Sequence, residues 1–233
     1  MIAALKSRIP DANVWLLFAA TLLLSSAYGM AVSIIGLYLD ERGLSKTEVG
    51  NLAVVFALGI VALSLPMGGI ARRLSAKRTL VIALLGYAGT VLVFPRLPGF
   101  GWMAGVRFLD GVFSVGVWVA SEIILLARAR DEHKAYATSL YAIMLALGYV
   151  VGPLLAKIAI GWGGMPAVFH GAGALAIGAA ALLALKLDPD PPEMHEEVKE
   201  KGGGEAPGSL DLLRRIKTSC FATFSYGYFQ ATA

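Results

Sequence analysis

The chain has 233 residues, of which 57% are hydrophobic and 15% charged, and its formal net charge is +4. A soluble domain of this length needs more charged residues on its surface. The composition therefore excludes an ordinary soluble protein. The cations adjoin apolar segments rather than one face with stacking aromatics, so nucleic acid is not an expected partner. The single cysteine, Cys220, excludes an internal disulfide and an all-cysteine metal site.

Six apolar stretches follow one another along the chain and predict an all-α membrane protein. Each has roughly the 17 to 25 mostly apolar residues that a helix needs to cross a bilayer. The alternating pattern of barrel strands does not occur in them. The stretches cover about residues 14–39, 47–70, 79–95, 101–126, 136–160 and 164–187.

The first stretch resembles a secretory signal, because Lys6 and Arg8 precede its apolar run. Its apolar character continues to Leu39, which exceeds a signal core of about 7 to 15 residues, so we predict an uncleaved helix. Four hydroxyl groups in it could line a cavity or bond to their own helix backbone. They belong to Ser25, Ser26, Tyr28 and Ser33.

The second stretch begins at a marked helix start, where Ser45 and Glu48 form a capping-box pattern.

The basic residues in the connections between the stretches predict the orientation of the chain. Fifteen of the 20 Lys and Arg residues fall in alternate connections. Cytoplasmic loops are enriched in these residues. We therefore predict a cytoplasmic position for four segments: the N-terminus, loops 71–78 and 127–135 and segment 188–217. The membrane is expected to be the inner membrane of the cell.

The fourth stretch carries a polar stripe. An ionisable residue near the bilayer centre costs roughly 2.5 to 3.5 kcal/mol, so the stripe is predicted to face a protein interior or an aqueous cavity. At 100° per residue, its members occupy one third of the helix circumference. They are Arg107, Asp110, Gly111, Ser114, Trp118, Ser121 and Glu122.

The three ionisable residues of this stripe have two interpretations each. Arg107 and Asp110 are three residues apart and can form an ion pair, which is either structural or part of a transport path. Glu122 has no cation on its own face within one turn. Without a partner in a low-dielectric environment, the Glu122 carboxylate would favour its protonated form and could carry a proton. Alternatively it lies at the cytoplasmic interface, near Arg128 and Arg130, and is hydrated.

The composition predicts three parts along the chain. Residues 1–187 are a six-helix transmembrane bundle, and residues 188–209, rich in proline, glycine and charge, are a flexible cytoplasmic linker. Residues 210–233 are expected to hold an interfacial helix and the start of a seventh transmembrane helix. On this basis the chain is expected to be the front part of a longer protein.

Segment 68–78, between the second and third stretches, resembles the loop motif of the major facilitator superfamily. Transporters of this family have twelve helices in two six-helix halves joined by a cytoplasmic loop. Gly68, Arg73 and Lys77 match the motif, whereas Arg72 stands in place of its acid and Ser75 in place of its later glycine. The family uses this acid to lock the two halves in one state, so the chain departs from the family at this latch.

Two further segments resemble motifs of the same family. Segment 107–111 is similar to the fourth-helix motif, an arginine followed four residues later by glycine, with Asp110 where glutamine is usual. Segment 148–153 matches the core of the fifth-helix motif typical of antiporters, although Leu155 and Ala156 stand where that motif has glycines after the proline. Its small residues let a neighbouring helix approach closely, and its proline allows a bend. The residues expected to support conformational gating are therefore Gly68, Arg72, Arg73, Lys77, Gly148, Gly152 and Pro153.

The resemblance implies a secondary transporter that moves a small molecule by alternating access, with proton-coupled efflux as the favoured mode. The substrate or proton path would include Arg107, Asp110, Ser114, Trp118 and Glu122. The missing C-terminal half, or a second copy, would supply the opposing wall. Alternatively the chain is a non-transporting six-span protein that acts as an assembly or binding partner. No catalytic motif is present, so neither an enzymatic activity nor a cofactor or metal is expected.

Overall fold

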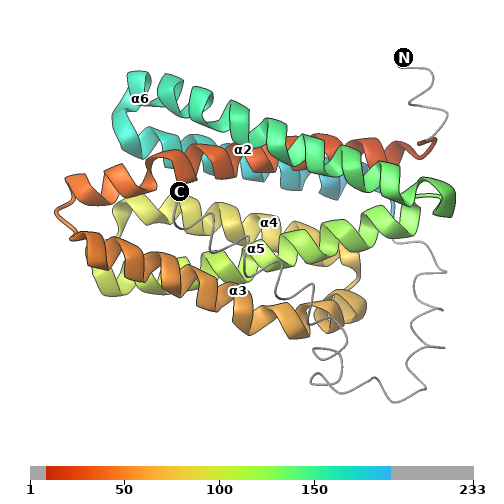
Figure 1. Cartoon of the computed structure of the whole chain (residues 1–233), viewed down its shortest axis with the longest axis horizontal. Helices are drawn as coiled ribbons and strands as arrows, with labels where there is room; N and C mark the ends of the chain where they lie inside the picture. Colours follow the sequence, from red (N-terminus) through yellow and green to blue (C-terminus); the bar gives the residue numbers. More distant parts are fainter. Residues whose placement is uncertain (1–8, 190–233) are drawn as a thin grey trace. The chain divides into compact units, whose positions relative to one another are not determined.

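The computed structural model describes residues 9–189, which form helices joined by short connections (Figure 1). The predicted seventh helix and most of the predicted linker lie outside the described residues. The helices are α2 (Ala12–Glu41), α3 (Lys46–Leu74), α4 (Ala76–Val93), η1 (Phe94–Arg96), α5 (Phe100–Arg128), η2 (Asp131–His133) and α6 (Lys134–Lys186). Five of these helices are long and apolar enough to cross a membrane. The described part of the chain contains no strand, in agreement with the predicted all-α class.

The long helix α6 covers two of the predicted stretches, 136–160 and 164–187. Its 53 residues would extend roughly 80 Å as one straight helix, against a hydrocarbon core of about 30 Å. The backbone leaves helical geometry at Gly163 (φ −155°, ψ 22°) and Gly164 (φ 68°, ψ −169°), and Pro166 follows. The chain reverses direction at this break (Figure 1). We call residues 134–162 the first arm of α6 and residues 165–186 its second arm.

Two helix starts follow directly from local sequence. At α3 the capping box is confirmed: the Glu48 backbone amide donates to Ser45 Oγ at 3.3 Å, and the Ser45 amide donates to Glu48 Oε2 at 2.8 Å. At α2 the carboxylate of Asp11 accepts a hydrogen bond from the backbone amide of Asn13 at 2.8 Å. Each bond satisfies an amide that has no partner in the first turn of a helix.

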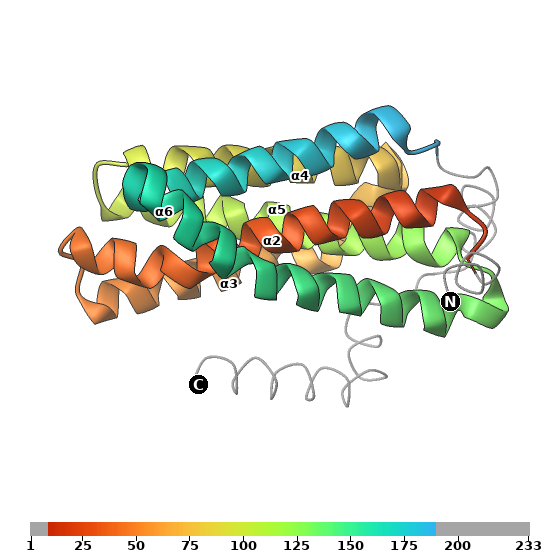
Figure 2. The same cartoon turned by 90° about the horizontal axis from the view of Figure 1, so that it is seen from above.

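Glycines set the closest helix contacts in the bundle. Helix α2 packs mainly on α6 and lies between its two arms (Figure 2), whereas α3 and α4 both pack on α5. A Cβ atom on Gly148 would lie 1.9 Å from Ser25 Oγ of α2, and one on Gly152 would lie 2.6 Å from Gly29 Cα. A Cβ atom on Gly111 of α5 would lie 2.1 Å from a backbone oxygen of α3. Only glycine permits these distances, so the crossings depend on these positions.

A network of hydrogen bonds joins the ends of α2, α4, α5 and α6. Asn13 and Asp188 exchange two hydrogen bonds, each 2.9 Å long. Arg128, whose side chain is 8% exposed, donates to the carbonyl oxygen of Asp188 at 3.0 Å. Lys77 donates to the carbonyl oxygen of Leu187. Segments that are far apart in the sequence therefore meet at one end of the bundle.

Two helix faces expose large apolar side chains. On α3 these are Val54, Leu58, Val61 and Leu65, and on the first arm of α6 they are Leu147, Val150, Leu154 and Ile158. Residues three or four apart share one face of a helix, so each set forms a continuous apolar row. Such rows suit contact with lipid or with another protein surface rather than water. The chain is a multi-pass membrane protein.

Candidate substrate site

The predicted pair of Arg107 and Asp110 is confirmed on α5. The Arg107 guanidinium donates a hydrogen bond to Asp110 Oδ2 and forms an ion pair with it. Asp110 is only 4% exposed, whereas Arg107 is half-buried. The guanidinium carbon also lies 4.4 Å from the ring centroid of Phe56 on α3, at cation–π distance. The two contacts hold the arginine between an acid and an aromatic face.

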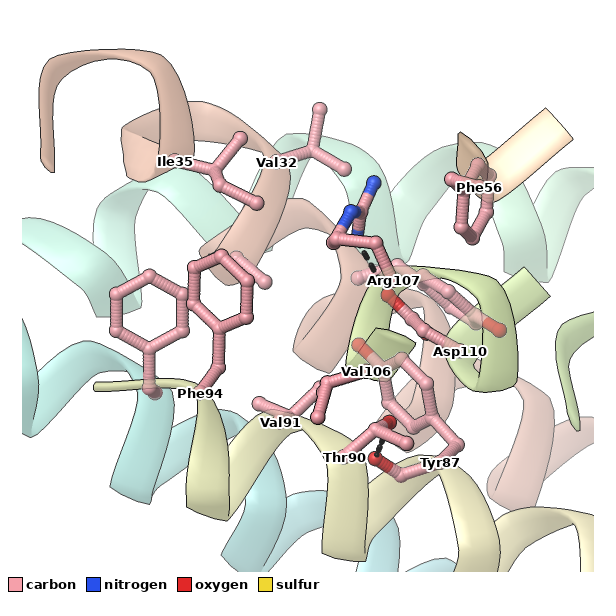
Figure 3. A pocket seen from close by; sticks show the side chains of 13 residues that line it. Val32, Ile35, Phe56, Tyr87, Thr90, Val91, Phe94, Val106, Arg107 and Asp110 are labelled. Carbon is pink, nitrogen blue, oxygen red and sulfur yellow. Dashed lines mark hydrogen bonds and ion pairs between the residues drawn. The ribbon is translucent and has the colours of Figure 1, made fainter. Parts of the chain in front are cut away.

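These two residues line a cavity of about 70 Å³, which we call the Arg107 cavity (Figure 3). Its walls come from α2, α3, α4, η1, α5 and the second arm of α6. Most of the lining is apolar, and it includes Val32, Ile35, Val91, Phe94 and Val106. Val32 is 61% exposed and marks the open side of the cavity. A largely apolar pocket with a few polar groups is the usual form of a small-molecule site.

Three polar atoms in the cavity lining have no hydrogen-bond partner among residues 9–189. They are the hydroxyl oxygen of Tyr87, Oδ1 of Asp110 and Nε of Arg107. A buried polar group without a partner destabilises the folded state by roughly 1–3 kcal/mol. Tyr87 is 1% exposed, so bulk solvent does not reach it directly. These atoms are therefore unused hydrogen-bonding groups of residues that line the cavity.

A cluster of aromatic and hydroxyl groups connects the cavity with the rest of the polar stripe. Tyr28 on α2 lines the cavity, and its hydroxyl donates to Ser114 Oγ at 2.6 Å. The ring centroids of Tyr28 and Tyr87 are 4.3 Å apart, and those of Tyr28 and Trp118 are 6.4 Å apart. The structure thus brings four of the five predicted path residues near Tyr28, of which Arg107 and Asp110 line the cavity and Ser114 and Trp118 do not.

The fifth residue, Glu122, lies away from this cluster. Its side chain is exposed and it does not line the cavity. Fifteen helical residues separate it from Arg107, roughly 22 Å along the axis. Any role in proton movement would therefore be separate from the Arg107 cavity.

The hydroxyl groups of α2 divide between the two expected roles. Ser25 donates to Thr21 O at 2.7 Å, and Ser26 donates to Leu22 O at 2.7 Å. These two bonds, and that from Ser33 to its own helix backbone, are internal to α2. Of the four hydroxyl groups, that of Tyr28 alone belongs to a residue of the cavity lining.

The residues expected to support gating occupy different surroundings. Gly148 and Gly152 face α2, as their close contacts show, whereas Gly68 has open space where a Cβ would stand. Pro153 lies within the first arm of α6 and is exposed. Arg73 is exposed, and Lys77 donates to the backbone of Leu187. The side chain of Arg72 lies outside what the structure describes.

The sequence interpretation missed the aromatic residues that close the cavity. Tyr87, Phe94 and Phe169 come from α4, η1 and the second arm of α6. Each lies in an apolar stretch, where an aromatic residue looks the same whether it fills the core or lines a pocket. Nothing in their spacing distinguishes these two roles.

Residues 17–233 match the family described as the Major Facilitator Superfamily. The chain belongs to this superfamily. It is 23% identical over 215 residues to a protein of Lactococcus lactis subsp. lactis (strain IL1403) named multi-drug resistance efflux pump PmrA homolog, which covers 88% of the chain and 49% of that relative. It is 28% identical over 143 residues to an uncharacterized MFS-type transporter, YcaD, of Escherichia fergusonii, which covers 61% of the chain and 37% of that relative.

A similar match, 26% identical over 143 residues, is an uncharacterized MFS-type transporter of Enterobacter sp. (strain 638). The chain spans 49% of the length of the first of these superfamily relatives and 37% of the other two. Proteins of the Major Facilitator Superfamily are membrane transporters rather than enzymes, and this membership agrees with the apolar helices of the bundle.

Proposed function

We propose that the chain forms the six-helix N-terminal half of a secondary transporter that works by alternating access. In this proposal α2 to α5 and the two arms of α6 are the six crossings. The break at Gly163 and Gly164 supports this count, because it divides α6 into two segments of span length. A second half, or a second copy of the chain, would close the Arg107 cavity from its open side. The exposed apolar rows on α3 and α6 provide surface for such a partner.

We place the N-terminus and loops 71–78 and 127–135 on the cytoplasmic side of a cell membrane, the inner membrane where there are two. The excess of Lys and Arg in these segments supports this orientation. The hydrogen bonds that join Asn13, Lys77 and Arg128 to residues 187–188 also support it, because they put the basic segments at one end of the bundle.

The Arg107 cavity is the proposed substrate site, and Asp110 is the proposed proton carrier. In the unprotonated state, the Asp110 carboxylate neutralises Arg107. A proton that binds to this carboxylate removes its charge and weakens the ion pair. The guanidinium is then free to contact the substrate or to move. Release of the same proton on the other side restores the pair. The buried, paired position of Asp110 is the observation that carries this proposal.

Proton-coupled efflux is the direction we favour, for two reasons. Segment 148–153 resembles a motif typical of antiporters, and the Lactococcus lactis relative is named as an efflux pump. The small-molecule substrate would be taken up at the cytoplasmic side and exchanged for a proton.

The decisive experiment measures coupled flux in vesicles. The chain, joined to its proposed second half, is reconstituted into vesicles that contain the pH-sensitive dye pyranine, and candidate small-molecule substrates are added outside. The Asp110→Asn variant is expected to lose proton movement driven by substrate, while it keeps exchange of labelled for unlabelled substrate. The matched control Glu122→Gln changes an exposed acid on the same helix. Proton movement of normal size in Asp110→Asn would refute the assignment of Asp110.

The 233-residue chain alone is a second control. As a single six-helix half it lacks one wall of the path, so it is expected to give no proton-driven flux in the same vesicles. Robust flux by the monomeric chain would contradict the proposed need for a second half.

A further inference from the structure

The Arg107 cavity combines an apolar wall with a small polar floor. Figure 3 shows Ile35 and Phe94 on one side and Arg107, Asp110 and Tyr87 on the other. The three polar atoms of the lining without a partner among residues 9–189 all belong to the second group. A ligand that satisfies both sides has a flat apolar body and one polar substituent.

The size of the cavity limits this body to one ring. An engineered protein cavity of roughly 150 Å³ holds benzene. The Arg107 cavity measures about 70 Å³ and opens beside the exposed side chain of Val32. The cavity has about half the volume that holds benzene, so a single ring would leave one edge in the mouth, and a fused or biphenyl system would leave most of its body outside.

The charges around the cavity favour an uncharged ligand. Arg107 and Asp110 neutralise each other, so the ion pair adds no net charge to the site. A cation or an anion bound beside this pair would remain without a counterion in a low-dielectric environment. The third ionisable residue of the stripe, Glu122, is too far along α5 to provide that counterion.

A hydroxyl group matches the two most buried of the polar atoms. It has one donor and two acceptor sites. It can donate to Oδ1 of Asp110, which accepts only, and accept from the hydroxyl of Tyr87. Both residues lie on the same side of the cavity (Figure 3).

We propose that the Arg107 cavity binds a small uncharged aromatic molecule that carries one hydroxyl group, a phenol-like compound. This inference rests on the proposed function where it treats the cavity as the substrate site. The binding itself is a property of residues 9–189, so it is tested on the 233-residue chain without transport.

The test is a ¹⁹F NMR titration of the purified chain in nanodiscs with four probes of nearly equal size. 4-Fluorophenol is expected to bind most tightly, since it is uncharged at neutral pH. Fluorobenzene lacks the hydroxyl, 4-fluorobenzylammonium adds a positive charge and 4-fluorobenzoate adds a negative charge. The variant Ala31→Phe fills the cavity from α2, so its signal measures the probe that partitions into lipid. This signal is subtracted from that of the native chain.

Two further variants separate the polar contact from simple apolar binding. Tyr87→Phe is expected to weaken 4-fluorophenol binding about five- to tenfold, as for one lost hydrogen bond, and to leave fluorobenzene unchanged. Because this variant removes a hydroxyl without a partner in the described part of the chain, it is expected to fold normally. The matched control Tyr141→Phe removes a buried hydroxyl outside the cavity lining and is expected to change neither affinity.

Saturable 4-fluorophenol binding that Ala31→Phe abolishes supports the inference. Equal affinity for fluorobenzene overturns the hydroxyl requirement, and tighter binding of either charged probe overturns the charge argument. Absence of saturable binding, with normal coupled flux in the joined transporter, refutes this inference and leaves the proposed function intact. Specific 4-fluorophenol binding without coupled flux in the joined transporter supports this inference and refutes the proposed function.

Discussion

Replacing Ser75 with glycine is predicted to stabilise the bundle. Ser75 is the single residue between α3 and α4, and it adopts φ 75° and ψ 146°. This region of backbone conformation is essentially restricted to glycine, because a Cβ atom clashes with the neighbouring peptide groups. It is also the position where the loop motif of the superfamily has its later glycine. The chain therefore carries backbone strain at a position where the motif that it resembles has glycine.

The size of the effect follows from three contributions. Relief of the strained conformation is worth about 1–3 kcal/mol. Glycine gains conformational freedom in the unfolded chain, which offsets about 0.5–1 kcal/mol. Ser75 Oγ also accepts a hydrogen bond from the backbone amide of Arg78 at 3.3 Å, and the loss of this cap to glycine costs a few tenths of a kcal/mol. The predicted net gain in the free energy of unfolding is about 1 kcal/mol, or a rise in Tm of about 2–4 °C.

Thermal unfolding in detergent, followed by size-exclusion chromatography, measures this rise. The matched control is Ser75→Ala, which keeps the Cβ atom and the strain but loses the cap, so it is expected to lower the free energy of unfolding by about 1 kcal/mol. The order of Tm should be Ser75→Gly, native chain, Ser75→Ala. If Ser75→Gly unfolds at or below the temperature of Ser75→Ala, the strain argument is wrong.

Two predictions concern other contacts of the bundle. Gly148→Ala is expected to destabilise the bundle by about 1–3 kcal/mol in the same unfolding assay, since the new Cβ would lie 1.9 Å from Ser25 Oγ. Gly161→Ala, in open space on the same helix, should not lower Tm, and equal losses in both variants would argue against the close crossing. Arg128→Ala removes charge-assisted hydrogen bonds, including that to Asp188 O, and is expected to cost about 1.5–3 kcal/mol. It should also speed limited proteolysis after α6, read by mass spectrometry, and an unchanged rate would contradict this role.

Local sequence determined the helices and several contacts within them. Apolar runs of span length predicted the helical segments, because backbone groups in lipid must be satisfied within the segment itself. The capping box at Ser45 and the pairing of Arg107 with Asp110 were also predictable, since each joins residues three apart. The predicted orientation and the predicted gating roles remain predictions.

Only the tertiary structure decided which side chains meet from different helices. It placed Tyr87, Phe94 and Phe169 around the predicted ion pair, and it left Glu122 outside that cavity. It also turned Gly148 toward α2. Periodicity along one helix shows that a face is buried but not what it is buried against. In a chain that is apolar almost throughout, that choice depends on the fit of side chains between helices, which is a property of the packed bundle.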